Sequence, residues 1–210
     1  MSRHIGHALP LVLLVCLASS PAAHAGGGPL GIDHPVRYDD SGIWKRSNQT
    51  ALIGTLVVGE IGLGLWEGGD SRLGRTDWQA IDASLLSAVS TETLKRVFRR
   101  ERPMNTNDPD QWFKSSKDKS FPSGEVSAVA AIVTPFVLEY GQDHPGVYLL
   151  EALPVYDAVA RVKVHGHWQS DVLAGFAIGT AVGWYAHSRP TSFTLSVLPG
   201  GVRVGYKARW

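Results

Sequence analysis

Apolar residues occur along this chain in long blocks, which are separated by short stretches of glycine, proline and polar residues. Within the blocks, large apolar side chains recur at the three- and four-residue spacing of a helix that buries one face. The blocks predict helices at about 49–66, 76–102, 123–140, 147–160 and 170–186. The expected fold is therefore all-α, a compact helical bundle of about five core helices.

The block at 49–66 differs from the others because it is almost wholly apolar and rich in glycine, with Glu60 as its one charged residue. Such a segment is typical either of a buried helix or of a marginal membrane helix. The apolar stretches at 126–138 and 172–185 are shorter than a typical membrane span. Burial in a protein core accounts for all three, so we expect a soluble or peripherally membrane-bound protein.

The N-terminus has the features of an exported protein. Arg3 gives a basic start, residues 9–17 are apolar, and Ala23-His24-Ala25 matches the small-x-small pattern that signal peptidase cuts. The apolar run is too short to anchor the chain permanently in a bilayer. We expect residues 1–25 to be a cleaved signal peptide and the mature protein to reach the periplasm.

The remainder of the chain divides by composition. Residues 26–48 are rich in glycine, proline and aspartate and are expected to form an N-terminal loop segment, before a helical domain at 49–190. From 191 to 210, apolar residues alternate with small or polar ones on both sides of Pro199-Gly200-Gly201. This change of period predicts a small C-terminal β-hairpin.

Charge and cysteine content exclude several classes of protein. Without residues 1–25 the chain loses Arg3 and its one cysteine, Cys16, which leaves 19 basic against 19 acidic side chains. A balanced charge argues against a nucleic-acid-binding protein, which would show a basic excess. The mature chain can form no disulfide bond within itself, and its length suits a single domain with a proper core.

Three polar segments are candidates for chemistry, and the first is a basic run at the end of the second helix. If that helix extends to residue 102, Lys95 and Arg102 lie seven positions apart on one face. The point charge of lysine and the planar guanidinium of arginine together suit a phosphate group. Basic runs also occur at helix ends as solvated charges. Arg96, Arg99 and Arg100 would point elsewhere and are expected to be solvated or in loop contacts.

The second segment is Phe121-Pro122-Ser123-Gly124-Glu125, at the start of an apolar helix. Ser123 suits the N-cap position, and the free N–H groups at a helix start form a ready anion site. Taken alone, the segment favours a capping turn that has no further role.

The third segment runs from Arg161 to Asp171. If a helix begins near His167, Asp171 lies one turn on and can orient the imidazole, leaving its other nitrogen free to attack. A lone histidine is often only a satisfied buried or surface side chain. His165 and His167, two positions apart, are only weak evidence for a zinc site, because the sequence offers no obvious third ligand.

Together the segments read K-x6-R-P, P-S-G and R-x5-H-x3-D, in that order. This signature resembles that of the phosphatidic acid phosphatase type 2 superfamily, which includes bacterial acid phosphatases, lipid phosphatases and vanadium haloperoxidases. The match covers residues 95–171. The haloperoxidases are usually larger, with added helices, so the resemblance favours a phosphatase for this short chain.

The resemblance implies a role for each matching residue. His167 would attack phosphorus and form a phosphohistidine that water then hydrolyses, with Asp171 orienting the ring. The phosphate would be held by Lys95, Arg102, Arg161 and the N–H groups around Ser123 and Gly124. Fixed cations would neutralise the transition state, so no metal and no cofactor is implied.

Glu125 departs from the family pattern, which normally has a histidine after P-S-G as the acid that protonates the leaving group. Glu125 can act as that acid if burial keeps it protonated, although the nearby cations oppose this. Alternatively, the acid is dispensable because the leaving group is already good, as in a diphosphate. In a third interpretation, the site binds phosphate without turning it over.

The sequence therefore predicts an exported, metal-independent phosphatase that hydrolyses a phosphomonoester or diphosphate through a phosphohistidine intermediate. Lipid-linked phosphate is among the candidate substrates, with peripheral contact to a membrane. The alternative that Glu125 raises is a catalytically impaired protein that binds phosphate or phospholipid.

Overall fold

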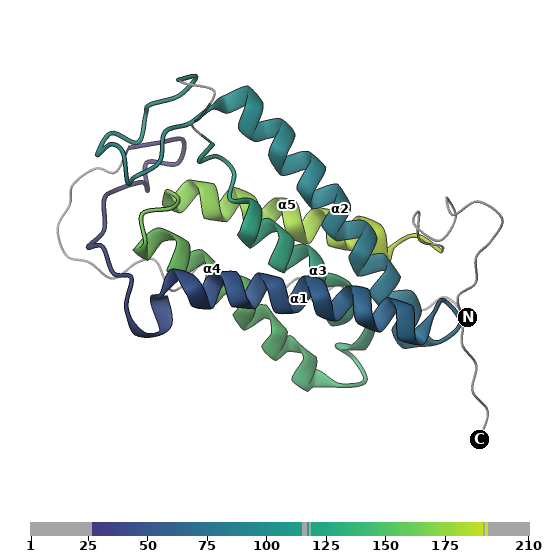
Figure 1. Cartoon of the computed structure of the whole chain (residues 1–210). Coiled ribbons are helices and arrows are strands. Elements are labelled where there is room, and N and C mark those ends of the chain that lie inside the picture. The colour runs from purple at the N-terminus through teal and green to yellow at the C-terminus, as the bar shows by residue number, and fades with distance from the viewer. Residues whose placement is uncertain (1–26, 115–116, 118, 191, 193–210) are drawn as a thin grey trace.

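The computed structural model describes residues 27–114, 117, 119–190 and 192, and this part of the chain is helical (Figure 1). Its elements are the 3-10 helix η2 (Gly42–Trp44), α1 (Arg46–Glu67), α2 (Arg72–Phe98), α3 (Gly124–Tyr140), the 3-10 helix η3 (Pro145–Glu151), α4 (Ala152–Lys163) and α5 (Gln169–His187). The prediction of an all-α bundle with five main helices is confirmed for these residues. The predicted signal peptide at 1–25 and, apart from Ser192, the predicted hairpin at 191–210 lie outside the described residues.

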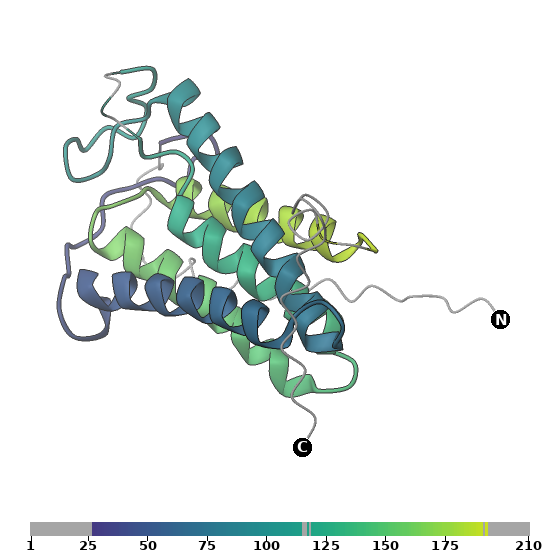
Figure 2. The same cartoon turned by 45° about the vertical axis from the view of Figure 1, so that its right-hand side comes forward.

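Helix α3 is the centre of the bundle and packs against each of the other four α-helices (Figure 2). Its buried side chains are small or β-branched, and they include Val126, Val129, Ala130 and Val133. The closest neighbour is α5, where a Cβ added at Gly179 would lie 2.2 Å from the carbonyl oxygen of Ser127. Glycine is therefore needed at that crossing, and the close approach sets α5, with its N-terminal Asp171, against the start of α3.

The end of α2 differs from the prediction. The helix stops at Phe98, because Arg99 takes the left-handed conformation (φ 43°) at the C-cap, and Arg102 lies in the following loop. The prediction that Lys95 and Arg102 share one helical face is therefore wrong. The predicted helix at 147–160 also divides, into η3 and α4, and α4 continues to Lys163.

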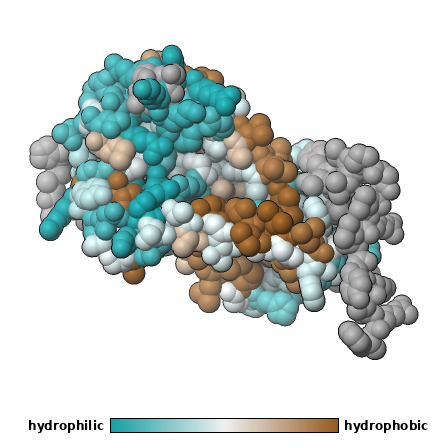
Figure 3. Space-filling model, viewed as in Figure 1, coloured by the Kyte–Doolittle hydropathy of each residue, from teal (hydrophilic) through white to brown (hydrophobic). Residues whose placement is uncertain are grey.

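Helix α1 is not a buried core helix, in contrast to the prediction. Of its 22 residues, only Gln49, Glu60 and Gly64 are buried. Among the described helices, α1 is the one whose length and composition would allow it to cross a membrane. Exposed apolar side chains from α1 and α2 lie side by side on the surface seen in Figure 3. We call this surface the apolar face; it comprises Val58, Ile61, Leu65, Trp66, Leu85 and Val89.

Candidate active site

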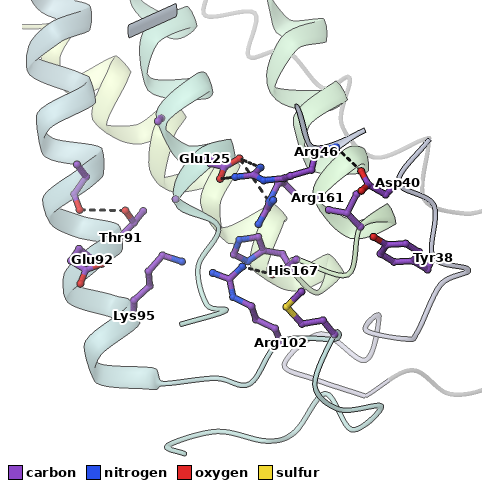
Figure 4. A pocket seen from close by; sticks show the side chains of 16 residues that line it. Tyr38, Asp40, Arg46, Thr91, Glu92, Lys95, Arg102, Glu125, Arg161 and His167 are labelled. Atoms are coloured by element: carbon purple, nitrogen blue, oxygen red, sulfur yellow. Dashed lines mark hydrogen bonds and ion pairs between the residues drawn. The ribbon is translucent and has the colours of Figure 1, made fainter. Parts of the chain in front are cut away.

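A cavity of about 710 Å³ opens at the end of the bundle where α1 and α3 begin and α2 ends. Six of the eight predicted site residues line it: Lys95, Arg102, Gly124, Glu125, Arg161 and His167. The other two, Ser123 and Asp171, are fully buried beneath it. In Figure 4, the guanidinium groups of Arg102 and Arg161 and the imidazole of His167 point into the same space, with Lys95 approaching from α2. Segments far apart in the sequence thus meet in one pocket.

The loop between α4 and α5 places His167. His165 has a positive φ of 54°, and a Cβ at Gly166 would lie 2.5 Å from Nη2 of Arg161. The guanidinium of Arg161 therefore lies directly against the loop backbone beside His167. Only 2% of the His167 side chain is exposed, and burial, reinforced by the charges of Lys95 and Arg161, lowers its pKa to about 3. The imidazole is neutral at physiological pH, as a nitrogen nucleophile must be.

Asp171 lies behind the ring of His167, with Oδ2 at 3.7 Å from Nδ1. This separation is that of an electrostatic contact and is longer than a hydrogen bond. The carboxylate is held instead by Ser120 Oγ (2.5 Å) and the Trp168 N–H (2.9 Å) on Oδ2, and by Arg100 Nη1 (2.6 Å) on Oδ1. Burial alone would raise the pKa of Asp171, but His167, Arg100 and Ser120 outweigh it and lower the pKa. Nδ1 of His167 thus faces a fixed anion, and Nε2 is left for chemistry.

Arg100 is the largest departure from the sequence prediction, which placed it in solvent or in a loop contact. Its side chain is fully buried, and it forms ion pairs of 2.6 Å with both Asp33 and Asp171. The guanidinium also lies 4.3 Å from the ring of Trp112. The expectation of a solvated side chain is wrong, because Arg99 ends the helix and the next residue turns inward. The alternative of a loop contact holds, since Nε and Nη2 of Arg100 donate to the Pro109 carbonyl oxygen at 3.0 and 2.7 Å. No sequence signal distinguished Arg100 within its basic run or marked Asp33 as its partner.

The three cations that the sequence predicted for the pocket are held mainly by neutral groups. Lys95 Nζ donates to the carbonyl oxygens of Lys119 (2.9 Å) and Pro122 (2.6 Å), and Arg102 Nη1 donates to that of Gly166 (3.2 Å). Burial and the neighbouring Arg102 lower the pKa of Lys95 to about 8.

Arg161 completes this set of cations. Its Nη1 donates to Gln49 Oε1 (3.2 Å), while its buried Nε has no hydrogen-bond partner among the described residues. Carbonyl and amide oxygens orient a cation without cancelling its charge. The inner end of the cavity is therefore suited to a phosphate-sized anion.

The Ser123-Gly124 turn contributes less than the sequence suggested. Ser123 is the N-cap of α3, but its hydroxyl makes no capping hydrogen bond and is buried without a partner among the described residues. Its backbone N–H donates to the carbonyl oxygen of Asp171 (2.9 Å), so this N–H is not directed at the pocket. Gly124 does line the pocket, where a Cβ would meet only the side chains of Lys95 and Thr91, at 3.5 and 3.6 Å.

Glu125 is paired with Arg46, a residue that the sequence placed in the N-terminal loop segment. The Arg46 guanidinium binds the carboxylate with both Nη atoms, each at 2.5 Å. Burial alone would raise the pKa of Glu125, but the hydrogen bonds from Arg46 and the charge of Arg161 lower it below the usual value. Glu125 is therefore ionised at neutral pH. No pattern around Arg46 could have indicated this role.

The described residues combine an all-α fold with a cationic pocket, as the three motifs predicted. A model of the PAP2 superfamily matches residues 78–194, more than half of the chain. The chain belongs to the PAP2 superfamily, and the predicted resemblance is confirmed.

Two curated relatives are similar over shorter stretches. A lipid A 1-phosphatase of Porphyromonas gingivalis is 39% identical over 66 residues, which are 30% of this chain and 15% of that protein. A lipid A 1-phosphatase of Rhizobium etli is 29% identical over 107 residues, 49% of this chain and 44% of that protein. The chain thus spans less than half the length of either. A crystal structure of Aquifex aeolicus LpxE aligns with a TM-score of 0.49 and 22% identity, over 66% of this chain and 82% of that one.

Proposed function

We propose that this protein is a phosphatase that hydrolyses a lipid-linked phosphomonoester or diphosphate through a phosphohistidine on His167. One observation carries the proposal. A neutral, buried imidazole faces a cavity whose inner cations, Lys95, Arg102 and Arg161, are oriented mainly by neutral oxygens. The Glu125 carboxylate lies 3.9 Å from Arg161 Nε and offsets part of the charge of that one cation. An oxyanion centred on phosphorus would neutralise the three cations.

In the proposed mechanism, Nε2 of His167 attacks phosphorus in line with the leaving oxygen. As the P–N bond forms, the P–O bond to the leaving group breaks and its electron pair stays on that oxygen. The three cations stabilise the negative charge on the equatorial oxygens, which is the main catalytic term in phosphoryl transfer. Asp171 is a positioning residue, which stabilises the positive charge on the ring while phosphorus is attached to Nε2. Water then attacks phosphorus, the P–N bond breaks, and phosphate leaves. Neutralisation by fixed side chains makes the proposed reaction metal-independent.

The apolar face supports a lipid substrate. Ala88 lines the cavity, and its neighbours on α2, Leu85 and Val89, are exposed members of the apolar face. An amphiphile could therefore place its phosphate in the pocket and its hydrocarbon chain along α1 and α2. Relatives named lipid A 1-phosphatases agree with this substrate class. With residues 1–25 as an export signal, the enzyme would act on lipid at the periplasmic side of a membrane.

A panel of substrates tests the proposed function. Purified protein is incubated with a soluble aryl phosphate, phosphatidic acid and an isoprenyl diphosphate, and released phosphate is measured. Hydrolysis of at least one amphiphile is the expected result. The ion pair at Glu125 favours one second candidate, a protein that binds phosphate without turnover. Binding of vanadate or phosphate with no release from any substrate would select that function.

The pH dependence of kcat/KM is expected to show two limbs set by the pocket. The pKa of His167, lowered to about 3, keeps the imidazole neutral above that pH, so activity falls as the pH drops through about 3. The pKa of Lys95, lowered to about 8, means that this cation is lost, and activity falls, as the pH rises through about 8. Lys95→Arg should shift the alkaline limb to higher pH and leave the acid limb in place. The ratio of wild type to variant at each pH removes the ionisation of the substrate, and an unmoved alkaline limb would exclude Lys95 as its source.

Substitution on the apolar face is expected to lower activity on lipid substrates and to leave activity on soluble substrates unchanged. Leu65→Asp or Trp66→Asp should lower activity on phosphatidic acid in vesicles at least about tenfold, because burying such a side chain contributes about 1.5–3 kcal/mol. Activity on a soluble aryl phosphate should not change. Leu149→Asp is the matched control, since Leu149 is 78% exposed on η3, which packs on α3 and α4. Equal loss in all three variants would show that the apolar face has no special role.

A further inference from the structure

Four side chains form a closed ring beside the cavity, and three of them, Arg46, Glu125 and Arg161, line it. Arg46 Nη1 donates to both Glu125 Oε2 (2.5 Å) and Gln49 Oε1 (3.1 Å), and Arg161 Nη1 donates to the same Gln49 oxygen (3.2 Å). Arg161 Nε lies 3.9 Å from Glu125 Oε2, which closes the ring. Gln49 is fully buried and is itself fixed by donation to the Trp44 carbonyl oxygen (2.8 Å). The ring therefore joins a deep cation, Arg161, to an outer one, Arg46.

The two arginines differ in depth. The side chain of Arg161 is 6% exposed and that of Arg46 is 42% exposed, with Glu125 between them at 25%. Three of the five N–H groups of Arg46 are accepted by Glu125 and Gln49. As far as the described residues go, two N–H groups remain, on a guanidinium that lines the cavity. A ligand anion that extends outward from the inner phosphate site would meet them.

Glu125 is unsuited to protonating a leaving group. Both of its oxygens accept hydrogen bonds from Arg46, and a carboxyl that carried a proton on either oxygen would lose one of them. Arg46 and Arg161 together favour the ionised form. The position where the family normally has its general-acid histidine is thus occupied by an ionised carboxylate, Glu125. This carboxylate contacts and orients Arg46 and Arg161.

We propose that Arg46 binds the leaving group, that Glu125 and Gln49 are the residues that position it, and that the substrate is therefore a diphosphate. This inference rests on the proposed phosphatase function. An alkoxide leaving group needs a proton, whereas a departing phosphate, whose second pKa is about 6, leaves as an anion. A fixed guanidinium suits that anion by forming bidentate, charge-assisted hydrogen bonds.

The proposed reaction cleaves the bond between the terminal phosphorus and the bridging oxygen. As Nε2 of His167 forms the P–N bond, the P–O bond breaks and its electron pair stays on the bridging oxygen. The leaving group is thereby an organic phosphate monoester anion held by Arg46. Water then forms the new P–O bond, the P–N pair returns to Nε2, and the protons of water stay on the inorganic phosphate or pass to solvent. The products are the organic monophosphate and inorganic phosphate.

The test compares n-decyl diphosphate with n-decyl phosphate, which share one tail, in the same detergent micelles. Wild type should show a kcat/KM at least about 100-fold higher for the diphosphate, because a general acid, worth about 10²- to 10⁴-fold, is missing for the alkoxide. Arg46→Gln should lower kcat/KM for the diphosphate about 10- to 100-fold, as loss of charge-assisted hydrogen bonds predicts, and for the monoester less than about threefold. Arg46→Lys should retain part of the preference.

Arg72→Gln is the matched control, since Arg72 is also 42% exposed and paired with a glutamate, Glu139, at the opposite end of α2 from the pocket. This variant should leave kcat/KM for both substrates unchanged. Glu125→His, which places a proton donor in the pocket, should raise monoester hydrolysis at least about tenfold and reduce the diphosphate preference. Urea midpoints close to that of wild type would show that the variants are folded.

Two results would overturn the inference and leave the phosphatase proposal intact. One is a wild-type protein that hydrolyses the monoester at least as fast as the diphosphate. The other is an Arg46→Gln variant that loses the same factor on both substrates. A folded wild-type protein that hydrolyses neither would overturn both proposals.

Discussion

Replacement of His167 by alanine is expected to lower kcat at least about 10⁴-fold, because it removes the nucleophile and leaves only the phosphate-binding groups. The loss should be the same for phosphomonoesters and diphosphates, since both would pass through one phosphohistidine. Phosphate or vanadate should still bind, because Lys95, Arg102 and Arg161 are held by backbone carbonyls and Gln49 and not by the ring. Released phosphate gives the rate, and calorimetry gives the binding.

The covalent intermediate gives a direct measure of the same step. Wild-type protein mixed with substrate and quenched in alkali should carry one additional phosphoryl group on the peptide that contains His167, as seen by mass spectrometry. His144→Gln is a suitable control, because His144 is exposed in the loop between α3 and η3 and should leave both rate and labelling unchanged. Turnover that persists in His167→Ala, or a label found on another residue, would contradict the mechanism.

The helices were predictable because each satisfies local rules. Helix α3 coincides with the apolar block that begins after Pro122, and α5 with the block that begins after Trp168. The observed start of each helix therefore lies within one residue of the predicted start. The position of helix α1 in the sequence was predicted correctly, but the prediction that this helix is buried was wrong. An apolar, glycine-rich segment has the same pattern whether it faces a protein core, a membrane or the surface, and only the packing of α2 and α3 shows which side is covered.

Part of the site was predicted for a reason that the structure does not support. Lys95 and Arg102 line the same cavity, but Arg102 reaches it from a loop, because Arg99 ends the helix. The motif carried the correct grouping, whereas helical spacing did not. Arg46 and Glu125 are 79 positions apart, and Arg100 and Asp33 are 67 apart. Contacts of that separation depend on how the loops fold back over the bundle, which no local pattern records.

Arg96 and Arg100 show how little a basic run tells about its members. Four positions apart in sequence, they have side chains that are 73% and 0% exposed. Arg96 pairs with Glu92 on the surface of α2, while Arg100 joins Asp33 and Asp171 beneath the active site. Substitution of these two residues by methionine, which keeps an unbranched apolar stem, should therefore have very different consequences.

Arg100→Met is expected to lower the free energy of unfolding by about 3–5 kcal/mol, because it leaves the carboxylates of Asp33 and Asp171 buried without their cation. Arg96→Met, the matched control, should cost no more than about 0.5 kcal/mol, as an exposed i,i+4 pair predicts. Urea unfolding gives both values. The deficit of Arg100→Met should shrink as the pH is lowered, since protonation neutralises the orphaned carboxylates, whereas a simple packing defect would be independent of pH. Because Asp171 also faces His167, activity should fall under conditions in which the variant is still folded; a variant as stable and as active as wild type would show that the buried cluster does not support the site.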